Sequence, residues 1–112
     1  MQAVFSGAII IVPAIWPLEV VNALVVAERR KKISATKSAK FLQELQQLAI
    51  SVDTEGLDRV FSEVFEQARR YQRSAYDASY LELAKRRGLP FATKDEPLRR
   101  TAQELGIPIF HP

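Results

Sequence analysis

The feature that most constrains this fold is a set of four short apolar runs, each too short to form a helix of its own. The runs, which are predicted strands, cover residues 8–12, 50–53, 90–93 and 107–110. The segments between them have helical spacing and are predicted helices, at residues 18–32, 35–48, 56–72, 74–87 and 96–105. Parallel strands need crossover connections and are buried on both faces. The alternation therefore predicts an α/β fold, with a parallel sheet, helices on both faces, and a ligand crevice beyond the carboxyl ends of the strands.

Several predicted helices carry boundary signals of their own. Pro17 suits the first turn of the first helix, because a backbone N–H is not needed there. Gly88 and Gly106 follow the last two predicted helices, where glycine readily closes a helix in the left-handed conformation. The chain has 112 residues, which suits a single domain covering residues 1–112.

Composition excludes several classes of site and protein. The chain has no cysteine, so disulfides, thiolate metal sites and thiol nucleophiles are excluded, and a reducing cytoplasm is the expected location. Residues 3–18 are uncharged, but this stretch is short, contains Gly7, Pro13 and Pro17, and has no basic residue before it. It is therefore predicted to be neither a membrane span nor a signal peptide.

Positive charge is grouped along the chain. The net charge is +3, and the basic clusters lie at residues 29–32, 69–73, 85–87 and 99–100. Each cluster taken alone is consistent with a solvated helix end, where positive charge complements the helix dipole. The four clusters together favour a polyanionic partner such as nucleic acid.

One carboxylate lies where burial is expected. Glu19 is the only ionisable residue among the first 27, and it shares a helix face with Asn22, Ala23 and Val26. The helix is apolar nearly all round and is predicted to be buried. A buried carboxylate must be paired, hydrogen-bonded or bound to metal, although Glu19 in a first turn could also simply complement the helix dipole.

Two further carboxylates have comparable positions. Asp77 shares its predicted face with Tyr80, Leu81 and Ala84, and Asp95 follows the predicted strand at residues 90–93. Each also has a structural explanation: Asp77 fits a capping box that begins at Ser74, and Asp95 fits the N-cap of the next helix. If the three carboxylates converge, the all-oxygen site suits Mg²⁺ or Mn²⁺ and the hydrolysis of phosphate esters.

Three motifs closely resemble a known family. "VPAIWPLEVVNALVVAERR", "YDASYLELAKRRGLPFATKDEPL" and "AQELGIPIF" occur in this order and are similar to the PIN domain of VapC-type toxin ribonucleases. The resemblance covers nearly the whole chain. It implies that Glu19, Asp77 and Asp95 are catalytic residues that coordinate Mg²⁺ or Mn²⁺, with Asn22 and Thr93 as supporting polar residues.

The resemblance also implies an activity and partners. We expect a metal-dependent endoribonuclease of a type II toxin-antitoxin system, which uses metal-activated water to hydrolyse RNA. A small antitoxin protein that fills the site, and a homodimer or higher oligomer, are implied as well. Lys94 and Arg73 are the basic residues nearest in sequence to the metal residues, and we expect them to contact the RNA backbone.

The chain departs from the family at its start. The family opens with a central strand that ends in a metal-binding Asp, upstream of the strand that corresponds to residues 8–12. Without it, we expect unpaired strand edges and exposed apolar surface, which favour oligomerisation or pairing with a separate segment. The alternative function is a catalytically impaired module that binds antitoxin or RNA without cleavage. An unrelated doubly wound domain is disfavoured, because no glycine-rich phosphate loop follows a strand.

Overall fold

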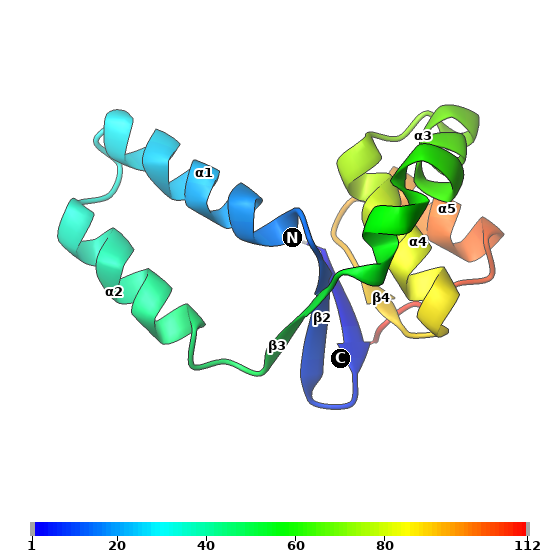
Figure 1. Cartoon of the computed structure of the whole chain (residues 1–112), viewed down its shortest axis with the longest axis horizontal. Coiled ribbons are helices and arrows are strands. Elements are labelled where there is room, and N and C mark those ends of the chain that lie inside the picture. The colour runs from blue at the N-terminus through cyan, green and yellow to red at the C-terminus, as the bar shows by residue number, and fades with distance from the viewer. Residues whose placement is uncertain (1, 112) are drawn as a thin grey trace.

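The computed structural model describes residues 2–111 and has an α/β architecture with a four-stranded sheet (Figure 1). The strands are β1 (Ala3–Ser6), β2 (Ile9–Pro13), β3 (Ile50–Asp53) and β4 (Phe91–Ala92). The α-helices are α1 (Trp16–Arg29), α2 (Ala35–Leu45), α3 (Phe65–Tyr71), α4 (Ala75–Arg87) and α5 (Glu96–Glu104). The α/β class predicted from the sequence is confirmed. Within residues 2–111, no helix combines the length and apolar character that crossing a membrane requires.

The sheet is mixed, which corrects the prediction of a parallel sheet. Its strand order is β3-β2-β1-β4, and only β2 and β3 pair in parallel among these strands, with Ile11 opposite Ser51. β1 is antiparallel to both β2 and β4. The reason is local: Gly7 adopts a positive φ of 60° in the short turn after β1, which lets the chain fold back at once as a hairpin.

β1 was not predicted, and it lies at the centre of the sheet. We expected unpaired strand edges there, but β1 forms hydrogen bonds with a strand on each side. The last predicted strand, at residues 107–110, is reduced to a single parallel bridge between Ile109 and Phe91. The sheet therefore has its central position filled by the residues that lie just before the first predicted strand.

The predicted helix at residues 56–72 is three consecutive segments in the structure. A 3₁₀-helix, η1 (Glu55–Arg59), is followed by a π-helical segment, η2 (Val60–Val64), and then by α3. The bounds of the four other predicted helices agree within three residues, for α1, α2, α4 and α5, and α4 ends at Gly88 in the left-handed conformation as expected.

The core lies between α4, α5 and one face of the sheet. α4 contacts β1, β2 and β4 and contributes most of the buried helix residues. Its buried members are joined by strand residues and by residues of α5 and its neighbours. These core residues are Val4, Ile11, Tyr80, Leu81, Leu83, Ala84, Phe91, Leu98, Ala102 and Ile107. α4 is therefore the helix that packs most extensively on the sheet.

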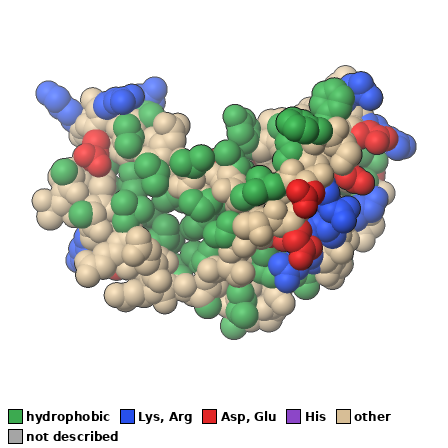
Figure 2. Space-filling model, viewed as in Figure 1, with side chains coloured by type: hydrophobic (Ala, Val, Ile, Leu, Met, Phe, Trp, Pro, Cys, Tyr) green, Lys and Arg blue, Asp and Glu red, His purple; other side chains and the backbone are tan. Residues whose placement is uncertain are grey.

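The prediction that α1 is a buried helix is wrong. No residue of α1 is buried, and Leu18, Val21 and Val25 are all exposed. α1 and α2 project from the rest of the molecule as a hairpin (Figure 1), and hydrophobic side chains show on its surface (Figure 2). Apolar composition predicts burial only if another element packs on the helix, and within residues 2–111 none covers this face.

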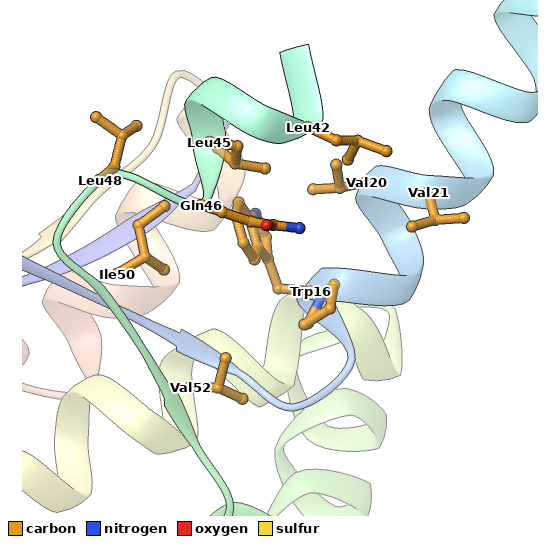
Figure 3. Close-up of a pocket in the computed structure, with 10 residues that line it drawn as sticks. Trp16, Val20, Val21, Leu42, Leu45, Gln46, Leu48, Ile50 and Val52 are labelled. Atoms are coloured by element: carbon orange, nitrogen blue, oxygen red, sulfur yellow. The ribbon is translucent and has the colours of Figure 1, made fainter. Parts of the chain in front are cut away.

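An open apolar groove separates the hairpin from the sheet. It has a volume of about 260 Å³ and lies between α1, α2 and β3 (Figure 3). Trp16 and Val20 line one side, Leu42 and Leu45 the second, and Ile50 and Val52 the third, all seen in the close-up. Helices therefore lie on both sides of the sheet, but only the α4 side forms a closed core.

Candidate functional site

The candidate site begins with two carboxylates brought together from α1 and α4. β2 and a short turn lead directly into α1, so that Glu19 lies in its first turn. Asp77 lies in the first turn of α4, where Ser74 Oγ accepts a hydrogen bond from its backbone N–H at 3.0 Å. The capping role predicted for Ser74 is confirmed, and this cap fixes the backbone that carries Asp77.

Glu19 is exposed, which corrects the expectation that it is enclosed in the core. Its pKa is nevertheless raised, first because partial burial disfavours the charged form and second because Asp77 carries the same charge nearby. Among the ion pairs within residues 2–111, none includes Glu19 or Asp77. The two carboxylates therefore repel one another without a compensating ion pair.

Tyr80 belongs to the same site. It follows Asp77 by almost one turn of α4 and is 5% exposed. The pKa of its hydroxyl is raised, first by burial and then by the negative charges of Glu19 and Asp77. The hydroxyl therefore stays protonated at neutral pH and can act as a hydrogen-bond donor. Sequence reasoning placed Tyr80 on the face of Asp77 but assigned it no role in the site.

Gln2 is a second residue that sequence reasoning missed. Its side-chain Nε2 donates a hydrogen bond to Asp77 Oδ1 at 2.6 Å. This contact joins residues 75 positions apart in the sequence, and it depends on the antiparallel direction of β1. No local pattern around Gln2 could have indicated it.

Asn22 lies beside Glu19 at the opening of the site. Both residues line a shallow hollow of about 410 Å³ together with Ile15, Leu18 and Tyr76. The hollow is open to solvent, since Glu19, Asn22 and Tyr76 are all exposed. This position is compatible with the supporting polar role that the resemblance implies for Asn22.

Asp95 does not join the two carboxylates in one metal-binding group. Its Oδ1 accepts a hydrogen bond from the backbone N–H of Leu98 at 3.0 Å and caps α5. Within residues 2–111, no group of three or more His, Cys, Asp or Glu side chains is placed to hold a metal ion. The N-cap explanation for Asp95 is confirmed, and its role as a metal ligand stays a prediction.

Thr93 supports Asp95 rather than the carboxylate pair. Thr93 is buried, and its Oγ1 accepts a hydrogen bond from the backbone N–H of Asp95 at 3.1 Å. Arg99 Nη2 donates to the backbone oxygen of Thr93 at 2.8 Å. These two hydrogen bonds stabilise the turn between β4 and α5, and they therefore help to fix the backbone position of Asp95.

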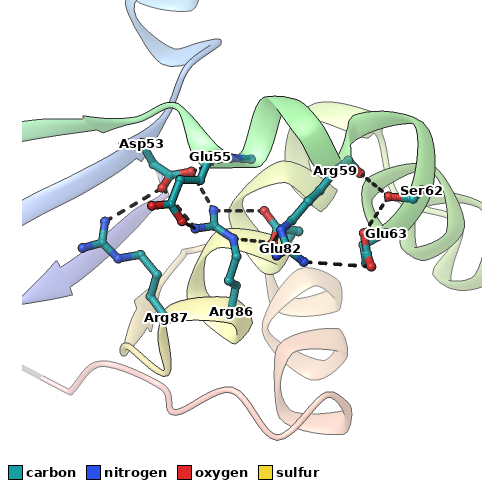
Figure 4. Close-up of polar contacts among 9 residues, drawn as sticks. Asp53, Glu55, Arg59, Ser62, Glu63, Glu82, Arg86 and Arg87 are labelled. Atoms are coloured by element: carbon teal, nitrogen blue, oxygen red, sulfur yellow. Dashed lines mark hydrogen bonds and ion pairs between the residues drawn. The ribbon is translucent and has the colours of Figure 1, made fainter.

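The basic residues differ in whether their side chains are exposed to solvent or bound to other groups of the chain. Lys94 is exposed next to Asp95, and Arg73 is half-buried with its Nε donating to the backbone oxygen of Tyr71 at 3.0 Å. Arg86, however, belongs to a buried ion-pair network (Figure 4). Its Nη2 lies 2.6 Å from Asp53 Oδ2 and its Nε lies 2.7 Å from Glu82 Oε2. Within the basic cluster at residues 85–87, Arg86 is therefore paired inside the chain and is not free to contact a polyanionic partner.

The network joins β3 to α4 and is structural. Burial raises the pKa of Asp53, but hydrogen bonds from Arg86 and from the Gly56 backbone, with the charges of Arg86 and Arg87, outweigh it, so that the pKa is lowered. Glu82 is only 3% exposed and lies on the buried side of α4. No sequence motif indicated these partners, because Asp53 and Arg86 are far apart in the chain.

The donor chemistry of the site fits a divalent cation in part. Glu19 and Asp77 supply two hard carboxylate groups, and Gln2 places an amide beside Asp77. A cation between the two carboxylates would remove the repulsion that raises the pKa of Glu19. The fit is incomplete, because within residues 2–111 no third His, Cys, Asp or Glu side chain joins them in a group that could hold a metal ion.

A comparison with protein-family models places this site in a wider context. A family described as the PIN domain matches residues 3–104, which include Glu19, Asp77 and Asp95. Comparisons with curated proteins and with solved structures find no match.

Proposed function

Since this chain belongs to the PIN domain family, whose fold is of the nuclease type, we propose that it is a metal-dependent endoribonuclease of a type II toxin-antitoxin system. The observation that carries the proposal is Glu19, which lines an opening to solvent and whose pKa is raised by burial and by the nearby charge of Asp77. Mg²⁺ or Mn²⁺ bound there would supply activated water and neutralise charge on the phosphodiester.

The residues of the chain would prepare this site in distinct ways. Asp77 is held at its backbone by the Ser74 cap and at its side chain by Gln2. Glu19 approaches from α1, which gives the two carboxylates independent supports. Tyr80 can donate a hydrogen bond, because its hydroxyl remains protonated at neutral pH.

The RNA and protein partners belong to the same proposal. Lys94 is exposed beside Asp95, and Arg69 and Arg70 are exposed near the end of α3. Positive charge at such positions favours a phosphate backbone and predicts binding that weakens with salt. The antitoxin and its binding at the site follow from the resemblance of the motifs.

We also propose that the chain forms a dimer through α1. The exposed side chains Leu18, Val21 and Val25 form one apolar stripe, and no ionisable residue lies between Glu19 and Glu28. An antiparallel pair of α1 helices would place the apolar stripe of one copy against that of the other, with the basic residues Arg29 and Arg30 at the two ends. This self-complementary arrangement is what a twofold interface requires.

The activity test compares the wild-type chain with Asp77→Asn. Asparagine keeps the size of the side chain and an oxygen that can accept from Gln2, but it removes the charge. We expect the wild type to cleave a mixed RNA pool with Mn²⁺ and not with EDTA, and Asp77→Asn to lose at least about 100-fold of this activity, since its charge is essential to the cation site.

A second candidate function is a module that binds RNA or antitoxin without cleaving RNA. The capping role of Asp95 and the absence of a three-carboxylate group within residues 2–111 favour it. RNA binding without metal-dependent cleavage at any protein concentration would establish this alternative. Lys94→Ala and Arg73→Ala test the RNA contacts in either case, and unchanged RNA affinity in both variants would exclude the predicted contacts.

A further inference from the structure

The positive charge of this protein is concentrated at the tip of the hairpin formed by α1 and α2. Residues 29–40 contain six basic side chains and no acidic one, whereas the rest of the chain has ten basic and thirteen acidic side chains. The formal charge is therefore +6 for residues 29–40 and −3 for all other residues together. The basic residues of this tip are Arg29, Arg30, Lys31, Lys32, Lys37 and Lys40. A polyanion that approaches the molecule is attracted mainly to this end.

The charge of the basic tip is not neutralised within residues 2–111. All six basic residues are exposed, and none of them belongs to an ion pair in this part of the chain. Lys and Arg side chains gather at the end of the hairpin that points away from the sheet (Figure 2). By contrast, four basic residues elsewhere pair with carboxylates: Arg59, Arg86, Arg87 and Arg99. The tip is therefore available to an external anion.

Three lysines of the tip surround one hollow. The hollow is open, has a volume of about 370 Å³ and is lined by Glu28, Lys31, Lys32, Ile33, Ser34 and Lys37. The chain reverses at Lys31, whose φ of 57° lies in the left-handed region. This reversal brings Lys37, in the first turn of α2, beside the lysines that follow α1. Three ammonium groups around one concave surface, against a single carboxylate, suit the oxygens of neighbouring phosphate groups.

The lining of the hollow favours a nucleic acid backbone over a membrane surface. A basic segment that lies on a membrane also needs large apolar side chains or a lipid anchor. Ile33 is the only apolar residue in the lining, and it is half-buried. The lining also has no aromatic side chain on which a base could stack. The tip therefore suits contacts with phosphates, which position a nucleic acid without reading its sequence.

We propose that the basic tip of the hairpin is a binding surface for the phosphate backbone of RNA. The choice of RNA as the partner rests on the proposed function. Glu19 precedes Arg29 by ten residues on α1, which corresponds to about 15 Å along a helix. An RNA strand held at the tip has to span only this distance to reach the candidate site.

The test measures RNA binding by the full chain in EDTA, so that metal-dependent cleavage cannot consume the probe. The probe is a short fluorescent polyuridine RNA, and its dissociation constant is measured at several salt concentrations. The tip variant combines Lys32→Gln with Lys37→Gln. The control variant combines Lys85→Gln with Arg100→Gln, which removes the same charge from exposed positions on α4 and α5.

The two variants should differ in affinity and in salt dependence. The tip variant should bind the RNA about tenfold more weakly at low salt, because it loses two phosphate contacts. Each lost contact with a single strand should make the slope of log affinity against log salt shallower by about 0.7, or about 1.4 in total. The control variant should keep the wild-type slope and stay within about twofold of the wild-type affinity, because solvent ions screen distant charges.

Three results would overturn the inference. If both variants weaken binding equally, the RNA responds to total charge and not to the tip. If the tip variant binds RNA as tightly as the wild type, the tip does not hold the backbone. Vesicles that contain phosphatidylserine test the third case: if the wild type binds these vesicles and no RNA, the partner of the tip is a membrane.

The ribonuclease proposal fails or stands by a separate measurement. Cleavage of RNA is measured with Mn²⁺ for the wild type and the tip variant. If the wild type binds RNA through the tip but cleaves none, the ribonuclease proposal fails while the role of the tip stands. If both proteins cleave RNA with Mn²⁺ and bind it equally well in EDTA, the ribonuclease proposal stands and the role of the tip is wrong.

Discussion

At the scale of single residues, Asp95 has a demonstrated role and a predicted one. Its carboxylate caps α5 through the backbone N–H of Leu98, and the family motif implies that it also binds metal. A carboxylate can fill both roles at once. One oxygen caps the helix, and the second oxygen has free lone pairs that can bind a metal ion. The two roles differ in what they require: the cap needs an oxygen, and the metal site needs a charge.

Two substitutions at Asp95 separate the roles. Asparagine is as good an N-cap as aspartate, so Asp95→Asn should leave the free energy of unfolding nearly unchanged, while Asp95→Ala should lower it by about 1 kcal/mol. Urea denaturation measures both effects. If Asp95 is a metal ligand, Asp95→Asn should also weaken Mn²⁺ binding, and unchanged Mn²⁺ affinity would leave the residue as a cap alone.

At the scale of elements, α4 connects the site to the frame of the molecule. Asp77 and Tyr80 lie toward its start, and Glu82 and Arg86 connect its second half to β3. The Arg86 side chain is only 12% exposed and faces two carboxylates that are less exposed still. A displacement of α4 would therefore disturb the network and the site together.

Removing the guanidinium should destabilise the fold. Arg86→Met removes the closest cationic partner of the buried Asp53 and Glu82, and breaking a buried ion pair in this way typically costs about 3 to 5 kcal/mol. Urea denaturation at neutral pH measures the loss. Arg100→Met is the matched control, because Arg100 is exposed on α5, and it should change the free energy of unfolding by less than about 0.5 kcal/mol.

The pH dependence of the same variant provides a second check. In the wild type the pKa of Asp53 is lowered from 3.8, so its contribution to stability is present above that pH and is lost as the pH falls through the folded pKa. Without Arg86, its hydrogen bond and its charge no longer oppose burial, so the pKa of Asp53 should be higher than in the wild type. The stability deficit of Arg86→Met should therefore shrink as the pH falls from 7 toward about 4, and a deficit independent of pH would argue against this account.

At the scale of the whole molecule, the hairpin of α1 and α2 is the part whose apolar side chains are least covered by the rest of the chain. α1 buries no residue, Leu18 is 67% exposed, and the groove beside β3 is lined almost entirely by apolar side chains. Contiguous apolar surface of this kind typically marks an interface. The basic residues at the tip of the hairpin would limit which parts of two copies can meet, and they favour antiparallel pairing of α1.

Self-association through α1 makes a direct prediction. The wild type should sediment as a dimer at micromolar concentrations, and Val25→Asp should shift it to monomer by placing a charge in the apolar stripe. Gln47→Asp, on an exposed residue after α2, is the control and should leave the dimer intact. Sedimentation velocity measures all three, and a wild type that is monomeric at every concentration would rule out the interface.

Local signals were sufficient for much of the molecule. The cap at Ser74, the end of α4 at Gly88 and the cap at Asp95 were all predictable, because each depends on residues within a few positions of one another. β2 and β3 were predictable from short apolar runs. Glu19 and Asp77 were recognisable as candidates because each follows a helix start within a distinctive motif.

Only the tertiary structure decided the rest. The reversal of β1, the contact of Gln2 with Asp77, and the Arg86 network each join residues that are far apart in the sequence. Likewise, the apolar pattern of α1 indicated that another element should cover this helix. It did not indicate whether that element belongs to the same chain or to another one. The sequence by itself thus determined the helix caps, most elements and the candidate carboxylates, since these depend on local spacing. Strand direction, the partners of Asp77 and the exposure of Glu19 depend on long-range packing, which no local pattern encodes.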